Sequence, residues 1–211
     1  MLDDRGFDLW AGVYDRDVRE SDERNEYPFA GYRKLMMTMD QRIREHGGRR
    51  ILDLGVGTGF LSKILYDDGY SITGIDFSRE MLAMARERMP RGLFIEADLT
   101  QGLPSKLRGE VFDLAISTYA LHHFDQAGKL RLIRDLVPLL DPKGLILIGD
   151  IAFADRASLD LCRESTDEWD DGEDYLVFEE IRPHLLDYRP QFETISHTAG
   201  ILALQLSPEG K

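Results

Sequence analysis

The pattern of hydrophobic and polar positions changes its period along the chain and divides it into three stretches. Residues 1–48 show no strand-like alternation, and apolar side chains recur at helical spacing over residues 7–14 and 29–44. Tyr27-Pro28 separates the two predicted helices, and Gly47-Gly48 follows the second one. The pattern therefore predicts an N-terminal segment built of helices.

From Arg49 onward, short apolar runs alternate with segments of helical spacing. The predicted strands are Ile51–Leu54, Ser71–Ile75, Leu93–Ala97, Val111–Ser117 and Leu145–Ile148. The predicted helices are Phe60–Asp68, a helix from the N-cap Ser78 to Met89 with Met81, Leu82 and Ala85 on its inner face, and Asp125–Leu140. Strands separated by helices imply parallel βαβ crossovers, so we expect a sheet with helices on both faces.

The last third of the chain has a different pattern. Residues 151–175 are polar, and residues 175–186 have helical spacing. Two strand-like runs, 189–197 and 201–206, are joined by Thr198-Ala199-Gly200, which predicts a hairpin. Five parallel strands followed by a hairpin predict an α/β fold with a Rossmann-like, doubly wound sheet of seven strands, mostly parallel with the last strand antiparallel.

Composition narrows the classes of function. The chain has 211 residues, a formal net charge of -13 and a pI near 4.8, which argues against nucleic acid as a partner because phosphate contacts need a basic face. The single cysteine, Cys162, excludes an internal disulfide and a thiolate metal cluster. The acidic N-terminus resembles no signal peptide, and no apolar run is long enough to cross a membrane. We therefore expect a cytoplasmic protein without a membrane partner.

A glycine-rich turn follows the first predicted strand. Gly55, Gly57 and Gly59 stand at alternate positions, Asp53 precedes them, and Phe60 occupies the place where a dinucleotide fingerprint would continue its spacing. Such a strand–turn–helix offers backbone N–H groups to a ligand, and glycine permits both positive φ and close approach. Asp76, 21 residues after Gly55, ends the next strand, where a carboxylate can accept hydrogen bonds from ribose hydroxyls. These features predict an adenosine-type ligand, and the Asp76 spacing alone also suits NAD.

The order of motifs resembles the class I methyltransferases that depend on S-adenosylmethionine (SAM). Asp-x-Gly-x-Gly-x-Gly from Asp53 is similar to their motif I, and residues 112–124, FDLAISTYALHHF, are similar to the strand and loop of their small-molecule branch (type 11/25). Residues 7–15 resemble the W-A-x-x-Y-D segment of many members. A segment like L-x-P-x-G precedes the fifth strand, although Pro142-Lys143-Gly144 stands where Pro-Gly-Gly is frequent.

The resemblance implies roles for residues around the cofactor. Gly55, Gly57 and Gly59 would approach SAM, Asp53 would organise the loop, Asp76 would hold the ribose, and Asp98 with Leu99 would hold the adenine. Phe77, Ser117 and Tyr14 complete the predicted cofactor contacts. Alternatives stay open for three of them: Asp76 as a charge at a helix N-terminus, Asp98 as a turn residue, and Tyr14 as a packing residue.

The catalytic residues are less well indicated. Tyr119 and His122 are candidates, but orienting two bound reactants can lower a barrier by about 7–11 kcal/mol, whereas a general base contributes about 10²–10⁴-fold. The adjacent His122 and His123 do not share a helix face, so we predict no metal site and leave a base role for either histidine open. The acidic run Asp167–Asp174 is interpreted as a solvated lid, with recognition of a cationic substrate as the alternative.

These observations predict one methyltransferase domain that methylates a small molecule with SAM as methyl donor, by in-line displacement. We divide it into a helical cap (1–48), a cofactor-binding core (49–150), a second cap or lid (151–187) and a C-terminal hairpin (188–211). Two alternatives stay open: a SAM-binding sensor or regulatory protein without transfer activity, and an NAD(P)-dependent oxidoreductase.

Overall fold

The computed structural model describes residues 21–206. The predicted helix at residues 7–14, with Tyr14, lies outside this range. The strands are β1 Arg50–Leu54, β2 Ser71–Asp76, β3 Leu93–Glu96, β4 Phe112–Thr118, β5 Leu140–Phe153, β6 Leu176–Val177, β7 Gln191–Thr194 and β8 Ala199–Gln205. The helices are α3 Tyr32–His46, α4 Phe60–Asp67, α5 Arg79–Arg88, α6 Gln126–Leu136, α7 Arg156–Glu164 and α8 Phe178–Ile181. The alternation of strand and helix after residue 49 therefore follows the prediction.

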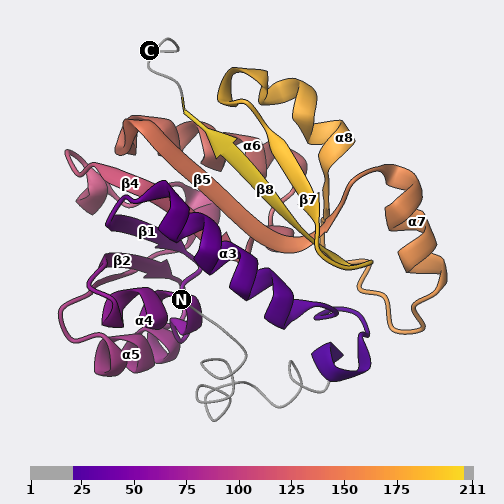
Figure 1. Ribbon diagram of the computed structural model, residues 1–211, viewed down its shortest axis with the longest axis horizontal. Coiled ribbons are helices and arrows are strands. Elements are labelled where there is room, and N and C mark those ends of the chain that lie inside the picture. The colour runs from indigo at the N-terminus through magenta and orange to yellow at the C-terminus, as the bar shows by residue number, and fades with distance from the viewer. Residues whose placement is uncertain (1–20, 207–211) are drawn as a thin grey trace.

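The strands form a twisted sheet in the order β3-β2-β1-β4-β5-β8-β7, and the short β6 pairs with the end of β5 (Figure 1). Pairings among the first five strands are parallel, while β8 is antiparallel to both β5 and β7. Leu54 of β1 pairs with Ile75 of β2 and Ser117 of β4, so these central strands end at the same level. The predicted Rossmann-like sheet with an antiparallel last strand is confirmed.

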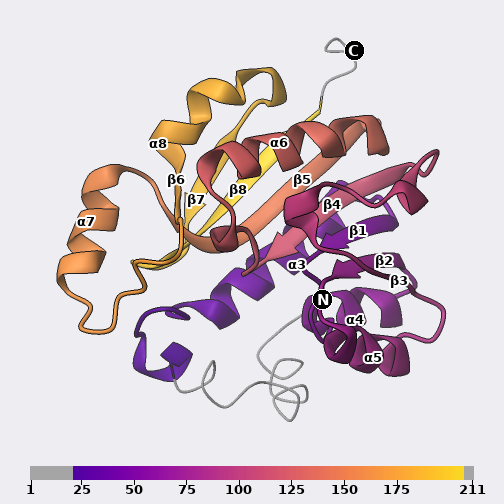
Figure 2. The ribbon, with the colours of Figure 1, turned by 180° about the vertical axis from the view of Figure 1, so that it is seen from behind.

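Helices cover both faces of the sheet, because successive side chains of a buried strand point to opposite sides. Ile51 packs in a core with Met39 of α3 and Leu82 of α5, whereas its neighbour Leu52 packs in a second core with Ile133 of α6. Figure 1 shows α3 crossing one face, and the view from behind in Figure 2 shows α6 and α8 on the other. The result is a three-layer arrangement that leaves the carboxyl ends of the parallel strands accessible.

Residues 140–164 differ from the prediction. The predicted strand at residues 145–148 is the middle of β5, which is longer because β4 and β8 pair with it on both sides. The polar stretch that follows contains α7, whose N-cap Asp155 accepts a hydrogen bond from the Ser158 amide at 2.8 Å. Only Leu159 and Cys162 of α7 are buried, so apolar spacing gives too weak a signal for this short helix.

Three further predictions are wrong in detail. Residues 175–186 do not form one helix but contain β6, α8 and a 3-10 turn. Ala199 and Gly200 belong to β8, and the hairpin turns at residues 195–198, where the Ile195 amide donates to the Ala199 carbonyl at 2.9 Å. In α5, Leu82 is buried as expected, but Met81 is 42% exposed and lines a cavity. In each case the local spacing of apolar residues gives the wrong structure or burial, because strand pairing over a long range or a cavity determines it.

Candidate functional site

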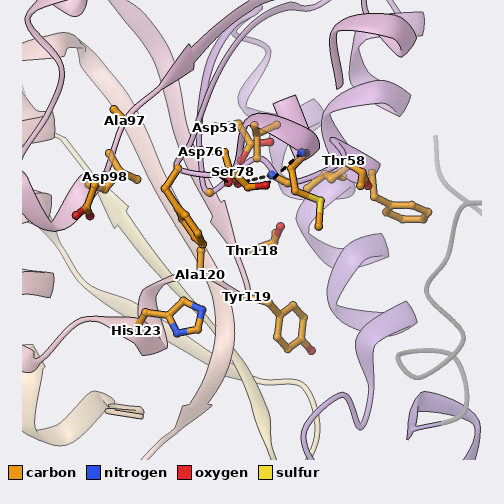
Figure 3. Close-up of a pocket in the computed structure, with 18 of the residues that line it drawn as sticks. Asp53, Thr58, Asp76, Ser78, Ala97, Asp98, Thr118, Tyr119, Ala120 and His123 are labelled. Carbon is orange, nitrogen blue, oxygen red and sulfur yellow. Dashed lines mark hydrogen bonds between the residues drawn. The ribbon is translucent and has the colours of Figure 1, made fainter. Parts of the chain in front are cut away.

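A cavity of about 860 Å³ lies at the carboxyl ends of β1 to β4 (Figure 3). Residues 55–58, 76–78, 97–100 and 118–120, which follow or end these four strands, contribute to its lining. Tyr32 of α3 and Phe60 of α4 line it as well. Open α/β sheets bind ligands at this edge, and small-molecule sites typically have volumes of about 300–1,000 Å³.

The glycine-rich turn forms one wall of this cavity. Gly55, Gly57 and Gly59 have φ values of 71°, 53° and 76°, a left-handed conformation that favours glycine. A Cβ on Gly55 would lie 2.4 Å from the Ala120 Cβ, whereas a Cβ on Gly57 would meet no heavy atom within 4 Å. Gly57 therefore faces open space in the cavity and Gly55 allows close packing of the loop after β4. Gly59 is the N-cap of α4 and is not among the lining residues.

Asp76 joins the glycine turn to the end of β2. Its Oδ2 accepts a hydrogen bond from the Gly57 amide at 2.8 Å, and its Oδ1 accepts one from the Ser78 amide at 2.9 Å. The side chain is buried but lines the cavity, and a carboxylate has about four acceptor sites in all. Asp76 can therefore hold the loop and still accept hydrogen bonds from a ligand.

Asp53 is a buried carboxylate with one unused oxygen. Its Oδ2 accepts a hydrogen bond from the Ser62 hydroxyl at 2.5 Å, while its Oδ1 has no hydrogen-bond partner among the described residues. Burial raises the pKa of Asp53 most, the Ser62 hydrogen bond lowers it and the charge of Asp76 raises it, and together these effects bring it to about 7. Because Asp53 lines the cavity, a cationic or hydrogen-bond-donating ligand group there would stabilise its ionised form.

The loop after β3 supplies a polar and an apolar lining residue. Asp98 Oδ1 accepts hydrogen bonds from the Thr100 hydroxyl and amide at 2.6 and 2.9 Å, and these bonds lower the pKa of Asp98. Leu99 lines the cavity beside it, and so does Phe77, whose side chain is 74% exposed. Asp98 thus caps a 3-10 turn, as the turn alternative anticipates, and also borders the cavity.

Tyr119 and His123 border the cavity on the side opposite Asp53 and Asp76 (Figure 3). Tyr119 has a φ of 49°, an unusual conformation for a residue other than glycine, and its ring stacks on Tyr32 of α3 with 5.3 Å between centroids. Two predicted site residues lie elsewhere. Ser117 is fully buried and donates a hydrogen bond to the Leu54 carbonyl at 2.8 Å, and His122 is not among the residues that line this cavity.

His122 instead forms a buried pair with Asp150. Its Nδ1 lies 2.6 Å from Asp150 Oδ1, and the two side chains are 9% and 1% exposed. Asp150 also accepts hydrogen bonds from the amides of Leu121, His122 and Ile151. Burial lowers the pKa of His122, but the charges of Asp150 and Glu173 and the Asp150 hydrogen bond raise it by more, so it exceeds the ordinary value of 6.5.

A second cavity of about 450 Å³ adjoins the first one. Tyr119 and His123 line both cavities. The remaining lining residues of the second cavity are Tyr27, Pro28, Phe29, His122, Ile151, Glu168, Asp170 and Glu173. The acidic run that follows α7 therefore contributes to a cavity that adjoins the one lined by the glycine-rich turn. Local spacing could not reveal this because the run lies about fifty residues after the histidines in the chain.

His122, His123 and Glu173 bring ligand-type atoms together. Glu173 Oε1 lies 3.6 Å from His122 Nε2 and 3.5 Å from His123 Nδ1, and all three atoms lie within 4.8 Å of one another. Zinc binds nitrogen and oxygen at about 2.0–2.2 Å, so tetrahedral ligand atoms lie about 3.3–3.6 Å apart, close to the two distances from Glu173 Oε1. The absence of a metal therefore stays a prediction, which chelation tests.

Comparison with known proteins gives the family. Residues 51–144 match the model of the methyltransferase domain family. An uncharacterized methyltransferase of Geobacillus kaustophilus is 36% identical over 151 residues, which cover 71% of this chain and 67% of that protein. One of Bacillus cytotoxicus is 35% identical over 156 residues, covering 73% and 69%. No described helix meets the length and hydrophobicity that a membrane crossing requires.

Solved structures share the fold. The magnesium protoporphyrin IX methyltransferase of Synechocystis, with bound S-adenosylhomocysteine (SAH), has a TM-score of 0.68 at 21% identity and covers 97% of this chain and 95% of that one. The plantazolicin methyltransferase, in complex with a desmethyl plantazolicin analogue and SAH, has a TM-score of 0.62 at 16% identity, with 94% of each chain covered.

Proposed function

We infer that this chain, which belongs to the class I SAM-dependent methyltransferases, transfers the methyl group of SAM to a small-molecule acceptor. The observation that carries the proposal is the pair of adjoining cavities at the carboxyl ends of the strands, one about 860 Å³ and the other about 450 Å³. Such volumes suit a cofactor and a small acceptor. The net charge of -13 disfavours nucleic acid, and the plantazolicin methyltransferase, with a similar fold, holds a small-molecule analogue.

The residues of the larger cavity fit SAM. Gly57 leaves open space where a side chain would stand, Asp76 keeps acceptor capacity for ribose hydroxyls, and Asp98 with Leu99 offers an acceptor beside an apolar surface. Asp53 Oδ1 lacks a partner among the described residues, and SAM carries two positively charged groups that could supply one. We assign Gly55 and Gly59 to the shape of the turn and Phe77 to the wall of the cavity.

The chemistry requires mainly orientation. When bound, SAM supplies a methyl group on a positively charged sulfur, which is already activated for displacement. Orienting two bound reactants can remove about 7–11 kcal/mol of the barrier. Tyr119, which lines both cavities and is held by stacking on Tyr32, would align the acceptor with the methyl group and exclude water.

The segments outside the core would enclose the acceptor. Tyr27 stacks on Trp169 with 5.0 Å between ring centroids, so the segment before α3 meets the acidic run directly. The rings of Phe29 and Tyr119 pack with 5.1 Å between their centroids, which connects the same segment to the loop after β4. These contacts support a single domain in which the described residues before α3, part of the predicted cap 1–48, and residues 151–187 cover the core at 49–150, with a hairpin at 188–211. The helix α3 itself packs on the sheet.

Transfer of a labelled methyl group tests the proposal. The protein is incubated with SAM labelled in its methyl group and, separately, with a small-molecule cell extract, total RNA, DNA and total protein. We expect label in a product of low molecular mass and none in the macromolecules. Label only in a macromolecule, or SAM binding by calorimetry without transfer to any fraction, would contradict the proposal.

A further inference from the structure

The second cavity has the chemistry of a cation-binding site. Three carboxylates line it, Glu168, Asp170 and Glu173, and no lysine or arginine is found among its described lining residues. The rings of Tyr27 and Phe29 form part of the same wall. Aromatic faces and carboxylates both favour a cation. An anionic acceptor would be repelled from this surface.

His122 gives this cavity a group that can accept a proton. Asp150 accepts three backbone N–H groups, which fixes it as an acceptor, so the Nδ1 of His122 must donate to it. In the neutral ring, Nε2 then carries a lone pair. Nε2 makes no hydrogen bond with the described residues, its nearest carboxylate oxygen is Glu173 Oε1 at 3.6 Å, and the residue lines the cavity. A histidine held by a buried carboxylate in this way is the usual arrangement for proton transfer.

We propose that the second cavity is the acceptor subsite, that it takes a primary or secondary amine which arrives protonated, and that His122 Nε2 receives the proton before methylation. This inference rests on the proposed function and adds to it the chemical class of the acceptor. Glu173 binds the ammonium group, and the rings of Tyr27, Phe29 and Tyr119 contact its carbon skeleton. Because Tyr119 and His123 line both cavities, the nitrogen can face the methyl group of the donor.

The reaction balances with one proton released. The ammonium transfers a proton to His122 Nε2 and becomes a neutral amine with a free lone pair. The amine nitrogen then bonds to the methyl carbon as the carbon–sulfur bond breaks, and the electron pair of that bond stays on sulfur in SAH. The product carries the positive charge as a methylated ammonium, and His122 releases its proton to solvent. An ammonium has no lone pair, so this acceptor needs the base that the structure provides.

Binding of matched probes tests the acceptor class. With the protein saturated by SAH, benzylamine, benzyl alcohol and benzoate are titrated by calorimetry at neutral pH. We expect benzylamine to bind at least about tenfold more tightly than the other two, and Glu173→Gln to remove the difference. Glu164→Gln, an exposed carboxylate at the end of α7, is the matched control and should preserve it. Equal binding of the three probes, or preference for benzoate, would overturn the proposal.

Fractionation of the labelled products separates this inference from the proposed function. A cell extract is methylated with labelled SAM, divided by cation exchange, and analysed by mass spectrometry. Label on the nitrogen of a retained amine supports the inference. Label confined to neutral or anionic small molecules overturns it and leaves the proposed function intact, whereas absence of labelled small molecules contradicts both.

Substitution of His122 tests the proton transfer. His122→Asn keeps a donor toward Asp150 but removes the base, and we expect kcat on the amine to fall about 10²–10⁴-fold with unchanged SAM affinity. In the wild type, kcat should rise with pH as His122 becomes neutral, above pH 6.5 because its pKa is raised, and the variant should lose this dependence. The groups that face His122 and set this profile are Asp150, Glu173, His123 and Lys129.

A control variant and two contradicting outcomes complete the test of His122. His184→Gln changes a remote exposed histidine and should leave kcat and its pH profile unchanged. A His122→Asn variant with wild-type kcat would overturn the role of His122. Loss of activity on chelation, restored by a divalent cation, would assign the cluster of His122, His123 and Glu173 to a metal and would also overturn it.

Discussion

At the scale of single residues, Asp53 destabilises the fold and is expected to contribute to the binding of SAM. Its pKa of about 7 means that the folded protein holds a proton which the unfolded chain releases near pH 3.8, so this group destabilises the fold as pH rises from about 4 to 7. SAM, with its positive charges, favours the ionised form. Asp53 should therefore lower the stability of the protein without ligand and raise the stability of its complex with SAM.

Asp53→Asn separates these two effects. At about pH 8 the variant should unfold at least about 3 °C higher than the wild type without ligand, because a buried charge is removed. Its affinity for SAM should be at least about tenfold lower, since a hydrogen bond to a charged group is worth about 1.5–3 kcal/mol. Below pH 7 the wild-type affinity should fall toward that of the variant. Thermal unfolding and calorimetry at several pH values measure both, and a variant that binds SAM normally at high pH would refute the role of Asp53.

Substitutions at Asp76 and Gly57 test whether the larger cavity binds SAM. Asp76→Ala should lower SAM affinity at least about tenfold, because acceptors for ribose hydroxyls and for the Gly57 amide are lost together. Asp76→Asn, which keeps one acceptor oxygen, should lie between Asp76→Ala and the wild type. Gly57→Val should abolish binding, since its side chain would enter open space in the cavity and its φ of 53° disfavours a branched residue. Wild-type affinity in Asp76→Ala would show that this carboxylate only orders the turn.

At the scale of elements, α3 belongs to the core of the sheet. Its Leu35, Met39 and Ile43 are fully buried against residues of β1, β4 and β8. We expect Met39→Ala to cost about 2–5 kcal/mol of unfolding free energy, as large-to-small changes in a core do. Gln41→Ala, on the exposed side of the same helix, should change it by less than about 0.5 kcal/mol. Denaturant titration gives both values, and equal stability of the two variants would refute the packing of α3.

Lys129 of α6 connects two loops of the proposed acceptor subsite. Its fully buried ammonium donates to the carbonyls of Phe124 and Asp174 and to the Asp174 carboxylate, and the Asp174 amide donates to the His122 carbonyl. Lys129→Met should cost about 1–3 kcal/mol, because buried acceptors lose their donor, and should speed hydrogen exchange in residues 168–175. The exposed Lys106→Met is the control and should change neither quantity. Unchanged exchange in Lys129→Met would show that the acidic run is held by other contacts.

At the scale of the whole molecule, the sequence predicts the sheet and most of the proposed cofactor residues that the structure places around the larger cavity. The period of apolar residues and the glycine turn are local signals, and Asp53, Asp76 and Asp98 each stand next to a strand end. The partners of His122 are distant from it in the sequence. Asp150 comes 28 residues later in the chain, on β5, and Glu173 lies in a loop after α7. Ser117 is the opposite case: it stands near the carboxyl end of β4, where site residues are expected, but its buried hydroxyl donates to the Leu54 carbonyl.

A crystal structure of the protein with SAH tests the central claim most directly, because it locates the donor relative to both cavities. The account predicts SAH in the larger cavity, with its ribose against Asp76, its adenine beside Asp98 and Leu99, and its sulfur next to Tyr119 facing the second cavity. SAH bound elsewhere, or with its sulfur directed away from the cavity that His122 and Glu173 line, would contradict the account.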